Sequence, residues 1–532
     1  MYSEKGLIAG ICACLAVSGA EAQVEAAALD DVNPWAVGFL AEDEGRLPGT
    51  LWSASEPDTL LALLRTTRTR NLSPGERLLL SQLVFSAGEA PEGELNIDLL
   101  AERARIILDL GEADIASQLF PLLSEPVGDA DPEELAVDLL LGLGNEDSAC
   151  AASESQAREG AFWAKLRAVC FALEGETGPA ELALELAISE GVEDPWFYEA
   201  VFAAIDLAPT PPPARYDSGI ALSLSARAEL PVPTDAIASS RADLAAAIAI
   251  NDNLQPDLRV QAAGIAAEAS LIDAQEHRAA YKALLEIEDF TPRTPVEIAI
   301  SANWQGDEAV DTKARTLHSA LRTAEGNLSR YHAVSRLLLD DINALPKADA
   351  TLRYGLTFAR ANLAAGDIAA SSDWITALSS GDADADEAFD HIWARSLLRF
   401  TGQSADGDGS LAIKLVERAD TPKKREAMRR LLVLWSAFDI PLGPGARAAL
   451  TADPSEDGDP VFPMLLRAIN AAANDGAAAE LILHTLKLTA GDPSNVRSSD
   501  MAQILEALRV IGAEEAARQL ALESTGFWKR EL

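Results

Sequence analysis

The stretch Ile107–Phe120, ILDLGEADIASQLF, has the pattern of a helix that ends, a tight turn at Gly111, and a second helix that begins. Glycine readily adopts the left-handed backbone conformation that commonly closes a helix. Similar stretches occur around Gly175, Gly366 and Gly512. This recurrence predicts a chain built of antiparallel helical hairpins.

Composition favours the same fold class. The chain has 532 residues, of which 48% are hydrophobic and 5% are aromatic. Alanine and leucine dominate, and long windows lack the strict alternation of apolar and polar residues that is typical of strands. The chain is too long for one ordinary core, so we expect several domains or an array of repeats.

The net charge of −41 restricts the kinds of partner that this chain can bind. Such a field repels the phosphate backbone of nucleic acids and disfavours docking on anionic lipid surfaces. The acidic residues are dispersed among apolar ones, which favours a solvated outer surface over an acidic recognition site. We therefore expect a protein or peptide partner and no nucleic acid.

The hairpins place small residues where two helices must approach each other, and larger residues one turn further on. The first unit has Ala116 and Phe120 in these places, and the second has Ala180 and Leu184. This arrangement resembles the tetratricopeptide repeat. The resemblance implies a right-handed superhelix whose concave face binds peptides or protein segments, and it carries over no ligand residues.

We accordingly predict an all-α fold in which antiparallel helical hairpins stack as an α-solenoid, a TPR-like superhelix. The alternative is an irregular all-α protein without true repeats.

Residues 1–22 have the layout of a secretory signal peptide. A short polar start with Lys5 precedes a run of small and apolar residues, and the AEA triplet at 20–22 resembles a cleavage site. The apolar run is too short to span a bilayer comfortably. We predict cleavage after Ala22, export to the periplasm, and no transmembrane span in the mature chain. A cytosolic chain that begins with an apolar helix is the alternative.

The same segment allows a second kind of processing. Ile11-Cys12-Ala13-Cys14 resembles a loose bacterial lipobox, in which Cys14 would be acylated. A second cysteine two positions before Cys14 departs from that pattern. We favour soluble export, whereas acylation of Cys14 would give the protein a lipid anchor.

Cys150 and Cys170 are the cysteines that remain after removal of a signal peptide. A pair of cysteines in an exported protein predicts one disulfide. The alternative is two buried free thiols, because free cysteine is commonly buried. Two cysteines without a nearby histidine do not make a metal site.

Composition divides the mature chain into four parts. Residues 23–57 lack periodicity and are expected to form an extended N-terminal arm. Successive helical patterns fill residues 58–207 and again residues 218–532. Between them lies APTPPPARYD, residues 208–217, whose consecutive prolines cannot continue a helix. We predict an N-terminal and a C-terminal helical-repeat region joined by a proline-rich linker.

Aromatic residues near the two ends of the chain are the candidates for partner binding, because interfaces use aromatic anchors. In the arm these are Trp35, Phe39 and Trp52, and near the C-terminus they are Phe527 and Trp528. The favoured interpretation is that the arm packs on the first helices and that the last two aromatics cap the final repeat.

No motif of catalysis or cofactor binding is present. None of the five histidines lies at metal-ligand spacing from another, and there is no P-loop, G-x-S-x-G or G-x-G-x-x-G. His277 lies in the charged stretch AQEHRAAYKALL, which predicts a surface position. The acidic stretch Asp406–Glu417 resembles an EF-hand loop, but Leu411 replaces the glycine that the bend needs. We predict no metal, no cofactor and no enzymatic activity.

Some exported superhelical lytic transglycosylases resemble this chain in their Ala-rich helices, and Glu523-Ser524 matches their catalytic pair. That pair lies nine residues before Leu532, and we expect no lysozyme-like domain around it. We predict a non-enzymatic scaffold or adaptor of the bacterial cell envelope that binds a protein or peptide partner through its helical-repeat surface. The alternative is a peptidoglycan-binding or glycan-cleaving superhelical protein, supported by Trp393 beside the carboxylates of residues 386–390.

Overall fold

The computed structural model describes residues 33–40, 47–92, 96–112, 115, 119, 131–154, 160–233, 237, 240–305, 307–381, 388–402, 409–452 and 457–529. Residues Pro34–Leu532 form one compact unit. The predicted signal peptide at 1–22, Cys14 and the cleavage site after Ala22 lie outside the described residues. So do Ala116, Phe120 and the start of the acidic loop at Asp406.

In the part of the chain that the structure describes, all regular structure is helical apart from an isolated β-bridge between Asp459 and Val496. The prediction of an all-α fold is confirmed for these residues. In the first half of the chain the helices are η1 (Pro34–Ala36), α1 (Pro57–Thr66), α2 (Pro74–Phe85), α3 (Asn96–Asp109), α5 (Pro132–Gly142), α6 (Glu146–Glu154), α7 (Ala161–Glu174), α8 (Thr177–Ser189), α9 (Pro195–Ala204), α10 (Gly219–Arg227), α11 (Ala242–Ile250) and α12 (Pro256–Glu268).

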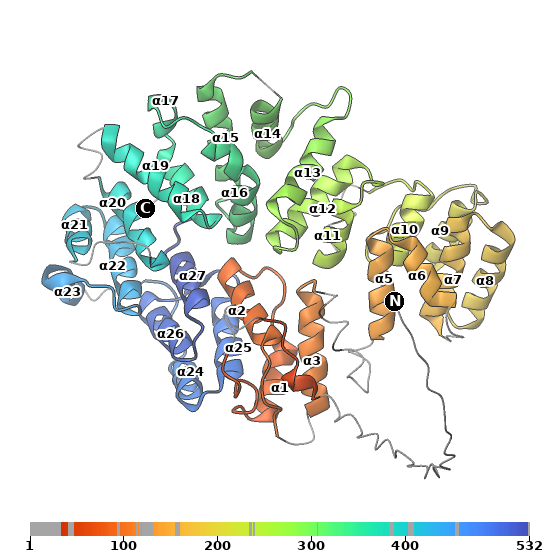
Figure 1. The fold of residues 1–532 in the computed structure, drawn as a ribbon, viewed down its shortest axis with the longest axis horizontal. Coiled ribbons are helices and arrows are strands. Elements are labelled where there is room, and N and C mark those ends of the chain that lie inside the picture. Colours follow the sequence, from red (N-terminus) through yellow and green to blue (C-terminus); the bar gives the residue numbers. More distant parts are fainter. Residues whose placement is uncertain are drawn as a thin grey trace, which may run out of the picture. The chain divides into compact units, whose positions relative to one another are not determined.

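The second half continues in the same manner (Figure 1). Its helices are α13 (Ala274–Leu285), α14 (Pro295–Trp304), α15 (Val310–Ala324), α16 (Leu328–Asn343), α17 (Asp349–Leu352), α18 (Gly355–Ala364), α19 (Ile368–Gly381), α20 (Phe389–Leu397), η4 (Leu398–Thr401), α21 (Ser410–Arg418), α22 (Pro422–Ser436), α23 (Gly443–Ala452), α24 (Pro463–Asp475), α25 (Ala478–Thr489), η5 (Pro493–Asn495), α26 (Ser498–Val510) and α27 (Glu514–Ser524).

Consecutive helices pack in pairs at the predicted glycine turns. The helix pairs are α7–α8, α18–α19 and α26–α27. The turns between their helices contain Gly175, Gly366 and Gly512, respectively. These glycines and Gly111 all have positive φ, between 77° and 87°. At Gly111 a side chain would also collide with Leu271, since a Cβ would lie 2.5 Å from its Cδ2. The glycine therefore allows both the turn and a close approach to the segment after α12.

Capping explains where α2 begins. The hydroxyl of Ser73 accepts a hydrogen bond from the backbone N–H of Glu76, and the Glu76 carboxylate accepts one from the N–H of Ser73. This is the capping box expected from a serine, a proline at N1 and a glutamate at N3. The same reasoning is wrong by one residue at α1, where Glu56 rather than Ser55 occupies the cap position and forms no side-chain cap.

The buried apolar residues form two clusters. One cluster runs from Val137 to Ala280, with Ala333 added from α16. The other combines residues 35–119 with residues 299–528, so it joins both ends of the described chain. The clusters meet along α12, α13 and α16, which pack against each other. Core formation is thus non-local for the second cluster, because its two parts are far apart in sequence.

The proline-rich segment 208–217 lies inside the first of these clusters. Ala214 and Tyr216 are buried in it, and α10 beyond the segment packs back on α5, α7 and α9 before it. Trp196 donates a hydrogen bond to the carbonyl of Pro213 at 2.7 Å. The segment is extended as expected of consecutive prolines, and core residues on both sides of it belong to one cluster.

Helices from opposite ends of the sequence are in contact. α2 packs against α25 and α27, and Figure 1 shows the orange α2 beside these two blue helices. Gly75 allows the close approach, since a Cβ there would lie 3.0 Å from Leu520 Cγ. In a simple solenoid each repeat contacts its neighbours alone, so this contact is an addition to that pattern.

Candidate functional site

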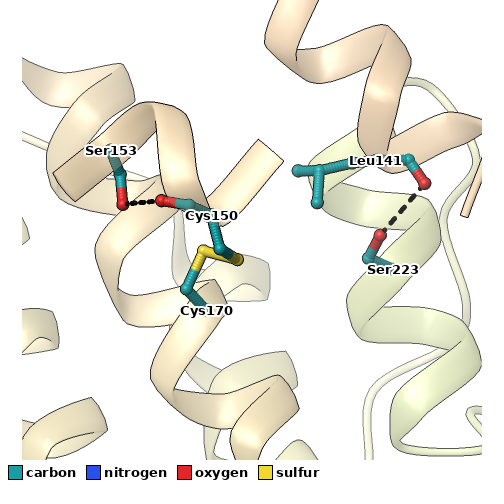
Figure 2. Close-up of a disulfide and its surroundings, with 5 residues drawn as sticks. All are labelled: Leu141, Cys150, Ser153, Cys170 and Ser223. Atoms are coloured by element: carbon teal, nitrogen blue, oxygen red, sulfur yellow. Dashed lines mark hydrogen bonds between the residues drawn. A yellow bond between two sulfur atoms is a disulfide. The ribbon is translucent and has the colours of Figure 1, made fainter. Parts of the chain in front are cut away.

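Cys150 of α6 and Cys170 of α7 form a disulfide, which confirms the predicted pairing (Figure 2). Their Cα atoms are 5.7 Å apart and the cysteines are separated by 20 residues in sequence. The carbonyl of Cys150 also accepts a hydrogen bond from the Ser153 hydroxyl at 2.7 Å. The disulfide fixes α6 against α7, the helix against which α8 packs.

α8 has an apolar face that the rest of the described chain leaves uncovered. Its buried face consists of alanines and Leu184, and α7 is the helix it packs against extensively. Leu182 and Leu186, four residues apart and therefore on one face, are 69% and 42% exposed. Ile188 adds a further exposed apolar side chain at 54%. Ile188 projects from a different side of the helix, so we call Leu182 and Leu186 the α8 patch.

The α8 patch is surrounded by negative charge. No lysine or arginine occurs between Arg167 and Arg215. Six glutamates in and beside α8 are exposed: Glu174, Glu176, Glu181, Glu185, Glu190 and Glu193. An apolar patch flanked by charges of one sign favours a partner with the same apolar pattern and the opposite charge.

The aromatic candidates for partner binding lie in the core instead. Trp35, Trp52, Phe527 and Trp528 are at most 3% exposed, and Phe39 is half-buried against the same cluster. Each has enough apolar area to pack between helices, which is the favoured interpretation given above. None of the four buried side chains presents a surface to a partner in this structure.

The arm packs around a buried arginine. Trp35 and Trp52 lie with their rings 5.4 Å apart, and the Arg103 guanidinium lies within 6 Å of both rings. Arg103 donates hydrogen bonds to the carbonyls of Val84, Val37 and Ser86. Burial lowers the pKa of Arg103 to about 10. The arginine thus ties the arm to the end of α2.

The histidines do not form a reactive cluster among the described residues. His277 is 4% exposed, so the surface position predicted for it is wrong. Its ring is tilted against that of Tyr281, with ring centroids 5.6 Å apart. Burial lowers the pKa of His277 to about 4, and does the same for His332. Both imidazoles are therefore neutral at ordinary pH.

Glu523, the residue that matches a catalytic motif, is fully buried. Its carboxylate accepts hydrogen bonds from the Ser73 hydroxyl at 2.5 Å and the Gly75 N–H at 2.8 Å. Gln519 donates a third at 2.9 Å. Burial raises the pKa of Glu523 to about 7. The group binds the start of α2 and does not line an accessible cleft.

Glu76 is the second carboxyl group at this contact. It accepts hydrogen bonds from the Thr489 hydroxyl and from the Gly491 N–H, the latter at 2.8 Å. Burial raises its pKa, and the three hydrogen bonds from Thr489, Gly491 and Ser73 oppose that effect. Two buried carboxyl groups therefore connect α2 to the C-terminal helices.

The described residues contain no group of three or more His, Cys, Asp or Glu side chains arranged to hold a metal ion. None of the helices in the described ranges combines the length and apolar character that crossing a membrane requires.

Comparison of the chain with models of known protein families and with curated protein sequences finds no match.

Sequence reasoning missed the α8 patch, although a signal was present. In LALELAIS, residues 182–189, leucine or isoleucine occupies every second position. A helix with one buried face needs apolar residues at intervals of three and four. Leu182 and Leu186 exceed that need, and such an excess indicates a second apolar face.

Proposed function

We propose that this chain is a non-enzymatic scaffold or adaptor of the bacterial cell envelope that binds a protein partner through the α8 patch. The partner presents an amphipathic helix whose apolar stripe is flanked by lysine or arginine. The proposal includes the export, periplasmic location and TPR-like stacking of hairpins expected from the sequence. The observation that carries it is the exposed Leu182 and Leu186 pair on a helix flanked by exposed glutamates.

The physical basis is the burial of apolar surface together with charge complementarity. Burying one leucine side chain is worth about 1.5–3 kcal/mol, so the α8 patch supplies part of the affinity of a helix-in-groove complex. The flanking glutamates accelerate association with a basic helix and repel acidic ones. The Cys150–Cys170 disulfide helps to hold α7, and thereby the base of α8, in place.

The glycan-binding alternative depended on an accessible Trp393, and this side chain is buried. Trp393 is 3% exposed, so its ring face is not available to stack on a sugar.

The proposal can be tested with a synthetic amphipathic helix that carries leucines four residues apart and lysines on both flanks. We expect it to bind the purified protein in a fluorescence-anisotropy titration, with affinity that falls as salt rises. L182E/L186E should weaken binding by about tenfold to a hundredfold, because it removes the buried leucines. V510E, at a site 67% exposed on α26, is the matched control.

A peptide of the same composition with scrambled order separates helix recognition from simple charge attraction. Equal affinity for both peptides, or equal weakening by V510E, would refute the α8 patch as the docking surface. In cells, a photo-crosslinker at position 182 should capture an exported protein at a basic amphipathic helix, and capture elsewhere in a protein would count against the proposal.

A further inference from the structure

A cavity of about 430 Å³ lies where the two core clusters meet. Its walls come from the α1–α2 connection, α3, the start of α11, the end of α12 and Ser329 of α16. This volume is within the range of small-molecule sites. Four arginines line the cavity, which is a marked local excess in a chain with 84 acidic and 43 basic residues.

Each carboxylate of the lining is already paired with an arginine. The pairs are Asp109 with Arg105 (2.6 Å), Asp243 with Arg241 (2.5 Å) and Glu268 with Arg330 (2.9 Å). Their negative charges are therefore balanced within the protein, and their remaining lone pairs stay available to accept hydrogen bonds.

Arg70 and Arg77 are the two arginines of the lining that these ion pairs do not use. Neither forms an ion pair with a carboxylate among the described residues. Arg70 is exposed at the mouth, and Arg77 donates a hydrogen bond to the carbonyl of Leu110 at 2.5 Å. Burial lowers the pKa of Arg77, with Glu112 opposing the effect. A desolvated guanidinium with one backbone acceptor has donors to spare.

We infer that this arginine pocket binds the carboxylate of a small ligand that also carries hydrogen-bond donors, such as an amino acid or the carboxy-terminal residues of a peptide. Arg70 and Arg77 take the carboxylate, because a guanidinium fork matches its two oxygens. The paired carboxylates accept from the amide or ammonium groups of the ligand. This inference is independent of the α8 patch.

The same charges disfavour phosphate. A phosphate dianion would lie beside Asp109, Asp243 and Glu268 with two unpaired arginines to balance it. A monoanionic carboxylate uses the same two arginines and meets less repulsion from the three acids.

The probe is a set of N-acetyl dipeptides, each as free acid and as amide, titrated into the full-length protein by calorimetry. At least one free acid should bind at millimolar concentration or below, and its amide should bind at least about tenfold more weakly. Hydrogen exchange should slow at residues 69–72 and 240–243 when the acid is bound, because these segments line the cavity.

Arg70→Gln should weaken binding of the acid by about tenfold and change the thermal unfolding temperature little, since Arg70 is exposed and solvent screens its charge interaction with Asp109. Arg70→Lys should restore part of the affinity. Arg447→Gln, at an exposed arginine of α23, is the control and should have no effect. Absence of binding by every free acid, equal binding of acid and amide, or binding of inorganic phosphate in preference would each overturn the inference.

Discussion

Glu523 carries the residue type that a catalytic motif requires, yet its surroundings give it a structural role. The carboxyl group has no exposed surface and accepts hydrogen bonds from Ser73, Gly75 and Gln519. Two of these donors are about 450 residues earlier in the sequence. A residue pair read without its environment therefore indicates little about chemistry, because burial and partners decide protonation and access.

The raised pKa of Glu523 gives a testable dependence of stability on pH. Because the folded-state pKa, about 7, exceeds the ordinary glutamate pKa of 4.5, the folded protein holds a proton that the unfolded chain releases. This contribution is complete below pH 4.5 and is lost as the pH rises through 7. We expect wild type to lose up to about 3 kcal/mol between pH 4.5 and 8 relative to Glu523→Gln.

The measurement is urea unfolding of both proteins across that range. The charge of Glu76 is one of the causes that raise the pKa of Glu523, so the difference between the two curves reports Glu523 together with its coupling to Glu76. Parallel curves, or a wild type that gains stability relative to Glu523→Gln as the pH rises, would contradict the pKa assigned to this group.

At the scale of single helices, sequence patterns predicted much of the structure. The capping box of α2 and the glycine turns after α7, α18 and α26 are local features, and the structure has them. At α1 the cap position is occupied by Glu56, which forms no side-chain cap there. The exposed leucines of α8 were overlooked because periodicity identifies a buried face and does not show whether a neighbour covers the other face.

The α6–α7 pair offers a prediction at this scale. A disulfide that closes a 20-residue separation should contribute about 3 kcal/mol, mainly by restricting the unfolded chain. We expect reduction to lower the stability of the α5–α10 region by this amount. The C150S/C170S double variant should have the lowered stability with or without reductant. Denaturant unfolding followed with and without reductant checks this, and an equal response of both proteins to reductant would exclude the disulfide as its source.

For the whole molecule, sequence reasoning identified helical hairpins and missed how they assemble. The contacts of α2 with α25 and α27 depend on Gly75, Ser73 and Glu523, which no local pattern connects. The grouping of residues 35–119 with 299–528 in one core is equally non-local. Hydrophobic periodicity specifies which face of a helix is buried, but many partners satisfy the same face.

Removal of residues 514–532 should therefore affect α2, far away in sequence. Loss of Leu520 and Glu523 leaves the start of α2 without its packing and its hydrogen-bond acceptor. We expect hydrogen exchange in α2 to accelerate by at least about tenfold while α7 and α8 keep their protection. Removal of residues 530–532 alone is the control. Unchanged exchange in α2 would show that its stability does not depend on α27.

The pairing of α2 with α27 also constrains the order in which the chain can fold. A chain that is synthesised from its N-terminus presents α2 long before α27 exists. Until α27 is made, the leucines of α1 to α3 lack part of their packing. Contacts of such high sequence separation also form slowly. The time at which α27 is synthesised would thus set the time at which α1 to α3 become resistant to proteases and aggregation.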